Sequence, residues 1–143
     1  MSVSTTPTQN AVRAPAGLLA WIPIYLELGK ARLNSFVVFT AGVGYMAALP
    51  AAEWNPLSLC WLVIGTALSA CGANGLNQVV EAGRDARMER TRNRPLPSGR
   101  ITVRHAMTVS LAGVALGSLL LTVTINTLTG ALALLTAVLY VLV

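Results

Sequence analysis

The chain has 143 residues, of which 55% are hydrophobic and 10% are charged, and its formal net charge is +5 at pH 7. This composition excludes a disordered chain and is too apolar for an ordinary soluble domain. The distribution of the charges argues against nucleic-acid binding, because seven of the ten basic residues lie in one connection between apolar segments.

The N-terminal region divides into a polar part and an apolar part. Residues 1–15 are rich in Ser, Thr and Pro and are predicted to be a disordered tail. Residues 16–32 are predicted to be an interfacial helix and the entry to the membrane. Their apolar run is too short to span and contains Pro23, while Trp21 and Tyr25 suit the level of the lipid headgroups.

Three long stretches carry no charge: residues 33–52, 54–80 and 105–143 contain no Asp, Glu, Lys or Arg. A helix needs about 20 mostly apolar residues to cross the hydrocarbon. The first two stretches fit one helix each, and the third fits two. The predicted helices lie near residues 34–51, 57–81, 104–125 and 131–143. A cleaved signal peptide that includes the first of them is a less favoured alternative, because the span and the polar segment before it are both long.

The third stretch is predicted to turn at 126–130, where Asn126 and Gly130 favour a hairpin. The helix after it, 131–143, would rise only about 20 Å, which is less than the roughly 30 Å of hydrocarbon. Its terminal carboxylate would then lie inside the bilayer at a high energetic cost. We therefore expect the sequence to be a truncated part of a longer protein.

The arginine-rich connection 82–103 sets the expected topology. Arg104 follows this connection at the start of the third span, three basic residues precede the first span, and the connections near 52–56 and 126–130 contain none. This distribution follows the positive-inside rule and places the N-terminus and the loop 82–103 in the cytoplasm. The sequence thus predicts an all-α, polytopic membrane helical bundle in residues 33–143.

Polar side chains form a stripe at the end of the second span. At about 100° per residue, Asn77, Glu81 and Asp85 lie on one face, flanked by Asn74 and Gln78. Two carboxylates so close repel each other unless a cation lies between them. Mg²⁺ binds one or two carboxylates together with phosphate oxygens, and arginine binds phosphate through two parallel hydrogen bonds. The pattern predicts a magnesium–diphosphate site, although helix-end charges that merely pair or reach the headgroups remain an alternative.

The loop after the stripe is predicted to leave the helix and fold back. Pro95 disfavours a helical conformation at Arg94, and Thr102 is predicted to cap the third span. The loop is long enough to cover the stripe as a lid. His105, one turn into the third span, is assigned a structural role rather than a catalytic one.

The run ANGLNQVVEAGRDARMERTRNRPLPSGRI, residues 73–101, resembles the first signature region of the protoheme IX farnesyltransferase (heme O synthase) branch of the UbiA-type membrane prenyltransferases. The wider superfamily shares only the Asn and the two acids, whereas M-x-R-T-x-x-R-P-L-x-x-G is more specific to the heme branch. Residues 27–48 resemble that family's first-span entry, with Ala31 where Pro is usual. The matching residues in the signature are Asn74, Asn77, Gln78, Glu81, Asp85, Met88, Arg90, Thr91, Arg94, Pro95, Leu96 and Gly99.

The resemblance implies a nine-helix fold of which this chain holds about four helices, and a second acidic motif in the C-terminal half. It implies a Mg²⁺-dependent transfer of a farnesyl group from farnesyl diphosphate to a vinyl group of protoheme IX (heme b), which gives heme O for heme A biosynthesis. It further implies a bacterial plasma (inner) membrane location and contact with heme A synthase or oxidase assembly factors. It assigns no residue to porphyrin binding.

By the same resemblance, the catalytic metal ligands are Asn77, Glu81 and Asp85. The residues implied to bind the diphosphate are Arg90, Arg94 and Lys30. Two other functions remain open from the sequence: a UbiA-type prenyltransferase with another aromatic acceptor, and a non-enzymatic membrane module whose arginine loop binds anionic lipid or a partner.

Overall fold

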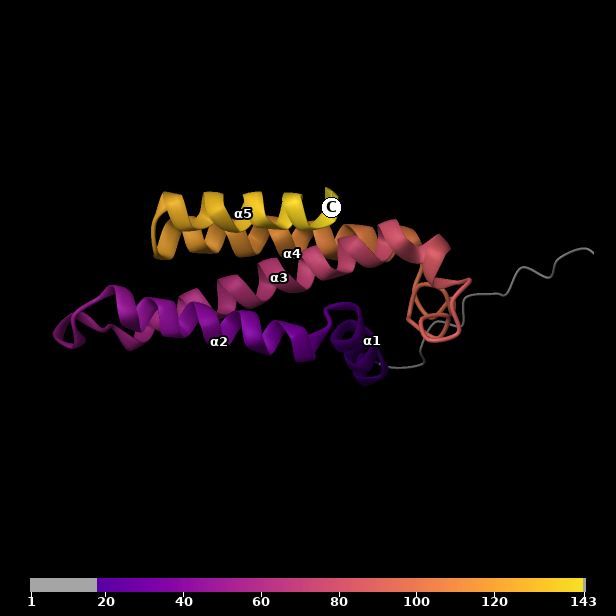
Figure 1. Cartoon of the computed structure of the whole chain (residues 1–143), viewed down its shortest axis with the longest axis horizontal. Helices are drawn as coiled ribbons and strands as arrows, with labels where there is room; N and C mark the ends of the chain where they lie inside the picture. The colour runs from indigo at the N-terminus through magenta and orange to yellow at the C-terminus, as the bar shows by residue number, and fades with distance from the viewer. Residues whose placement is uncertain (1–17, 143) are drawn as a thin grey trace, which may run out of the picture.

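The computed structural model describes residues 18–142, and these residues form helices joined by turns. Helix α1 lies at one end of the molecule, beside the loop that follows α3, while α2 to α5 run along the long axis (Figure 1). The predicted tail, residues 1–15, lies outside the described residues. The elements are a 3₁₀ helix at Leu18–Ala20, α1 at Trp21–Leu28, α2 at Ala31–Ala48, a 3₁₀ helix at Ala51–Glu53, α3 at Pro56–Asp85, α4 at Val103–Thr124 and α5 at Thr127–Leu142.

The predicted all-α class is confirmed, and α2 to α5 correspond to the four predicted spans. Within the described part of the chain, α3 and α4 are long and apolar enough to cross a membrane, and α5 is a shorter apolar helix. Large apolar side chains on α2 to α5 face outward, including Phe39, Val123 and Leu128. Such an outer surface is expected where lipid, rather than water, surrounds the helices.

The predicted hairpin at 126–130 was wrong in its extent. The chain turns at Asn126, and α5 already begins at Thr127. The Asn126 side chain accepts hydrogen bonds from the Thr129 amide and hydroxyl, at 2.7 and 2.9 Å. Gly130 lies inside α5, where an added Cβ would clash with Thr122 and approach the Ser118 carbonyl to 2.7 Å. This glycine therefore permits close packing of α5 on α4 and does not form the turn.

Helices α3 and α4 approach each other through glycine. A Cβ at Gly72 would lie 2.5 Å from the Ser110 carbonyl oxygen, and one at Gly117 would lie 2.5 Å from the Ser69 amide nitrogen. Backbone atoms cannot move aside as a flexible side chain can. Small residues at these positions thus let the two backbones pack closely, which is the usual source of helix association in lipid.

We expect Gly117→Ala to destabilise the bundle by about 1–3 kcal/mol, because the added methyl group forces the α3 and α4 backbones apart. Thermal unfolding of the detergent-solubilised protein measures the effect. Gly44→Ala is the matched control, since a Cβ there meets no atom within 4 Å. Equal unfolding temperatures for Gly117→Ala and the wild type would contradict this packing.

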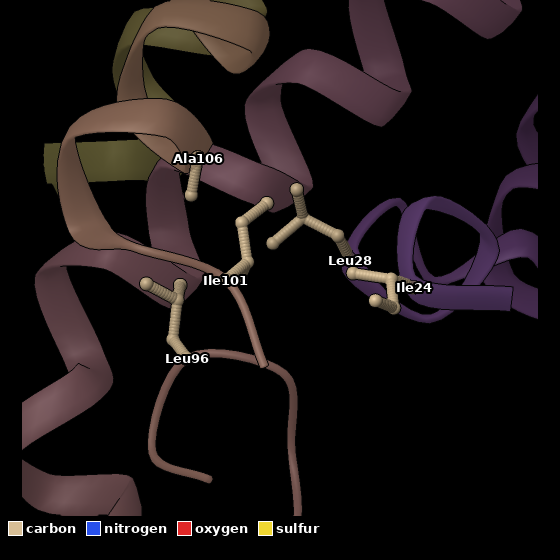
Figure 2. Close-up of a cluster of buried hydrophobic side chains, with 5 residues drawn as sticks. All are labelled: Ile24, Leu28, Leu96, Ile101 and Ala106. Carbon is tan, nitrogen blue, oxygen red and sulfur yellow. The ribbon is translucent and has the colours of Figure 1, made fainter. Parts of the chain in front are cut away.

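A small apolar core holds α1 against the start of α4 and the loop between α3 and α4. Ile24 and Leu28 of α1 meet Leu96 and Ile101 of the loop and Ala106 of α4 (Figure 2). All five side chains are buried. The loop is therefore a folded part of the structure, anchored at the end of the bundle where α3 carries its acidic residues.

Candidate functional site

The polar stripe of α3 faces the rest of the molecule. The side chains of Asn74, Gln78 and Asp85 are buried, and those of Asn77 and Glu81 are partly buried. Gln78 is 2% exposed and Asp85 is 5% exposed, whereas Val80 on the opposite face is 59% exposed. The inward orientation follows from the helical spacing, which places these polar residues on one side of α3 and Val80 away from them.

The two acidic side chains converge on one arginine nitrogen. Arg94 Nη1 lies 2.6 Å from Asp85 Oδ2 and 3.9 Å from Glu81 Oε2. The Thr91 hydroxyl donates to the Asp85 carbonyl oxygen at 3.0 Å, which ties the loop to the end of α3. The structure thus brings together three residues that the sequence assigned to the site. Both carboxylates pair with Arg94 of the loop, and neither pairs with the nearer Arg84 in the described residues.

The loop contacts the acidic end of α3 through Arg94 and contacts α1 through Arg100; that it covers the whole stripe as a lid stays a prediction. Arg100 Nη2 donates to Glu27 Oε2 of α1 at 2.8 Å and to the Asn93 carbonyl oxygen at 2.6 Å. Thr102 caps α4 by accepting from the His105 amide at 3.3 Å, as predicted. The His105 ring is hydrogen-bonded to the Tyr25 hydroxyl at 2.7 Å. These contacts hold α1, the loop and α4 together around the acidic end of α3.

The remaining predicted site residues form no hydrogen bond or ion pair with either acid in the described part of the chain. Asn77 makes no side-chain hydrogen bond to another described residue, and Arg90 is exposed and joins none of the ion pairs found in the described region. Lys30 is at the joint between α1 and α2, where its ammonium donates to the Tyr140 hydroxyl at 3.3 Å. The structure therefore joins Arg94 directly to the acidic pair and places Lys30 beside another set of polar groups.

The sequence did not predict this second set of polar groups, which consists of Asn34, Asn74 and Tyr140. Asn74 donates to Asn34 Oδ1 at 3.1 Å and accepts from the Tyr140 hydroxyl at 3.0 Å. Asn34 in turn donates to Cys71 Sγ at 2.6 Å. Asn34 is the only residue with an amide side chain in the predicted span 34–51, and Tyr140 is, with Thr136, one of two polar residues in the predicted helix 131–143. An isolated polar residue in such a span is the signal that could have found both.

These polar groups close one end of an apolar pocket. The pocket has a volume of about 550 Å³ and lies between α2, α3 and α5, within the usual range for small-molecule sites. At about 100° per residue, its α3 lining residues fall on the same face as Asn77 and Glu81. The acidic stripe therefore continues the pocket wall toward the loop. The residues that line the pocket include Leu33, Asn34, Val37, Thr66, Ala70, Ala73, Asn74, Ala137 and Tyr140.

The acidic pair suits a cation that takes further ligands from a bound phosphate. The described residues form no cluster of three or more His, Cys, Asp and Glu side chains that would hold a metal by themselves. Two carboxylates and an amide are nevertheless an adequate protein contribution for Mg²⁺, which retains waters and binds phosphate oxygens. Glu81 and Asp85 already share one positive nitrogen of Arg94, so their geometry fits a cation between them.

Comparison with known proteins places the chain among membrane prenyltransferases. The profile of the UbiA prenyltransferase family matches residues 37–143. No solved structure matches significantly.

Named relatives agree with this match. The chain is 40% identical to "Protoheme IX farnesyltransferase, mitochondrial" of Arabidopsis thaliana, over 98% of this chain and 33% of that protein. It is 41% identical to "Protoheme IX farnesyltransferase" of Opitutus terrae, over 83% of this chain and 36% of that protein. It is 37% identical to the mitochondrial protein of that name from Homo sapiens, over 82% of this chain and 26% of that protein. The chain thus spans about a third of the length of these relatives, and it belongs to the UbiA prenyltransferase family.

Proposed function

We propose that this chain carries the first diphosphate-binding motif of a heme O synthase. The reaction transfers a farnesyl group from farnesyl diphosphate to a vinyl group of protoheme IX, with addition of water, in heme A biosynthesis. The names of the relatives support the assignment of a farnesyl donor and protoheme IX as the substrates. The observation that carries the proposal is the convergence of Glu81 and Asp85 on one cationic nitrogen, at the end of the helix face that lines an apolar pocket.

In this proposal the polar stripe holds the head of farnesyl diphosphate. Asn77, Glu81 and Asp85 hold Mg²⁺, and Arg90, Arg94 and Lys30 donate to the diphosphate oxygens. When bound, Mg²⁺ neutralises negative charge on the diphosphate. The arginines do the same through charge-assisted hydrogen bonds, which strengthen as charge builds up on the leaving group.

The proposed transfer breaks one C–O bond and forms one C–C bond and one C–O bond. The C–O bond between the farnesyl carbon and the diphosphate breaks, and the electron pair leaves with the diphosphate. The farnesyl carbon bonds to the terminal vinyl carbon of the heme, water adds its hydroxyl group to the other vinyl carbon, and one proton is released. The apolar pocket supports the proposal by offering the farnesyl chain a surface without competing polar groups along most of its length.

We further propose that the protein works in a bacterial plasma membrane, with its N-terminus and the loop after α3 in the cytoplasm. Heme A synthase or oxidase assembly factors are the expected partners. We expect residues 1–143 alone to be inactive. The resemblance implies two acidic motifs, and residues 1–143 contain only the first of them.

A product assay tests the proposal. The protein is expressed from its complete reading frame, and membranes that contain it are incubated with Mg²⁺, farnesyl diphosphate and heme b. The products are then separated, and their masses are measured by mass spectrometry. We expect a product that has gained one farnesyl group and one hydroxyl group. Farnesylation of hydroxybenzoate but not of heme would favour an aromatic prenyltransferase, and the absence of any transfer would favour a non-enzymatic membrane module.

A further inference from the structure

Lys30 has an unusual backbone conformation at the joint between α1 and α2. Its φ and ψ are 49° and 55°, in the left-handed region, and it immediately precedes the first residue of α2. Among the described residues it is the one non-glycine residue with a positive φ. Glycine and asparagine adopt this conformation readily, whereas a lysine there is uncommon. Surrounding contacts must therefore hold it, and such strain often accompanies functional positions.

Two buried amides of α3 hold the three residues that precede Lys30. Gln78 Nε2 donates to the carbonyl oxygens of Glu27 and Leu28, at 3.2 and 2.8 Å. Asn74 Nδ2 donates to the carbonyl oxygen of Gly29 at 3.3 Å. Three consecutive carbonyl groups at the end of α1 are thus bonded to one face of α3. We call Asn74 and Gln78 the amide clamp.

The joint directs the Lys30 ammonium to the polar end of the pocket. Nζ lies 3.3 Å from the Tyr140 hydroxyl and 5.9 Å from the centre of the Tyr140 ring. Because an ammonium only donates, Tyr140 accepts from Lys30 and donates its own proton to Asn74 Oδ1 at 3.0 Å. This direction leaves Asn74 Nδ2 to donate to the Gly29 carbonyl, so the clamp and the ammonium are parts of one hydrogen-bond chain.

The order of groups along α3 indicates what the ammonium meets. The pocket lining extends to Asn74, the amide clamp spans Asn74 and Gln78, and the acids follow at Glu81 and Asp85. At 1.5 Å per residue, Glu81 lies roughly 10 Å beyond Asn74 along the axis. An amphiphile with its hydrocarbon in the pocket and its anionic head at the acids must pass the level of Lys30.

We propose that Asn74 and Gln78 are positioning residues that fix the left-handed Lys30, so that its ammonium binds the phosphate nearest the hydrocarbon chain. This inference rests on the proposed function for the identity of the amphiphile. It adds a role for two amides that make no contact with either carboxylate. It also explains why a lysine, rather than a conformationally easier glycine or asparagine, occupies the joint.

The first test removes the charge and keeps the backbone. Lys30→Asn suits the left-handed conformation but lacks the ammonium, so we expect a folded protein with about tenfold weaker binding, as for loss of one charge-assisted hydrogen bond. The probe is inorganic pyrophosphate with Mg²⁺, titrated calorimetrically into the purified protein expressed from its complete reading frame. Arg32→Gln is the matched control, because it removes the same charge two residues away at an exposed position, and its Kd should stay within about twofold. Wild-type affinity in Lys30→Asn would overturn the proposal.

The second test asks whether the clamp acts through Lys30. Gln78→Ala should weaken pyrophosphate binding when Lys30 is present, and it should cause no further loss in the Lys30→Asn background. A purely structural role for Gln78 would instead give the same fold-change in both backgrounds, which would overturn the positioning role. If Gln78→Ala fails to fold, Gln78→Glu retains the side-chain volume, and the Lys30→Asn titration still decides the role of the ammonium.

These tests separate the inference from the proposed function. Coupled effects of Lys30 and Gln78 on pyrophosphate binding, in a protein that does not farnesylate heme, would reject the acceptor and retain the positioning role. Heme farnesylation with an unchanged KM for farnesyl diphosphate in Lys30→Asn would reject the positioning role alone.

Discussion

Replacing Asp85 with Asn is expected to lower the rate of farnesyl transfer by roughly 10²–10³-fold, the usual cost of losing one group that stabilises developing charge. Asp85 is 5% exposed and contacts Arg94 at 2.6 Å. Asparagine keeps its shape and can still accept that hydrogen bond. The substitution removes the negative charge that would hold Mg²⁺ against the diphosphate. Initial rates of product formation, compared at equal amounts of protein in the membrane, measure the effect.

Glu89→Gln is the matched control for the Asp85 variant. Glu89 is an exposed carboxylate four residues further along the chain, and it joins no ion pair in the described residues. Its substitution removes the same charge from the loop that directly follows Asp85, and the transfer rate should change by less than about twofold. A rate near that of the wild type in Asp85→Asn would remove Asp85 from the site. A comparable loss in both variants would mean that the net charge of the loop, rather than the acidic pair, sets the rate.

The arrangement of the acidic residues was predictable because it depends on one helix. Asn77, Glu81 and Asp85 share a face through spacing alone, and α3 remains helical to Asp85. Local geometry of this kind requires no knowledge of the other helices. The spacing alone did not fix which side of α3 faces inward, since Val80 is exposed but Val79 packs against the apolar core.

The choice among the arginines was not predictable in the same way. The loop between α3 and α4 contains five arginines, and spacing along an irregular loop does not say which of them turns back to the acids. Arg94 does so because Leu96 and Ile101 anchor the loop in the apolar core with α1. That core joins segments far apart in the sequence, and helical periodicity does not encode it.

The polar end of the pocket shows the same limit. Asn34, Asn74 and Tyr140 lie on three different helices, and their hydrogen bonds connect residues up to 66 positions apart. The left-handed conformation of Lys30 was equally hidden, because lysine gives no turn signal. Gly130, by contrast, gave a turn signal but serves close helix packing. Glycine and asparagine in a membrane bundle therefore indicate either a turn or a close contact between helices, and the sequence alone does not distinguish the two.

Replacing Arg94 with Gln is expected to change two affinities in opposite directions. Arg94 Nη1 lies 2.6 Å from Asp85 Oδ2 and 3.9 Å from Glu81 Oε2, so we expect it to compete with a divalent cation for these carboxylates. Without the guanidinium, Mn²⁺ added alone should bind roughly fivefold more tightly, which corresponds to about 1 kcal/mol for a partly exposed ion pair. Pyrophosphate with Mg²⁺ should bind about tenfold more weakly, because a charge-assisted donor to phosphate is lost. Electron paramagnetic resonance of Mn²⁺ and calorimetry of pyrophosphate measure the two affinities separately.

The opposite signs distinguish a shared cation position from a merely structural arginine. If Arg94 only anchors the loop, its loss should disorder the site and weaken both ligands together. Arg92→Gln is the control, because Arg92 is exposed and joins no ion pair in the described part of the loop, and both affinities should stay within about twofold. Arg94→Lys should restore part of the pyrophosphate affinity, since lysine supplies the charge but lacks the two parallel donors. Weaker Mn²⁺ binding in Arg94→Gln would show that the acidic pair needs its arginine and does not exchange it for a metal ion.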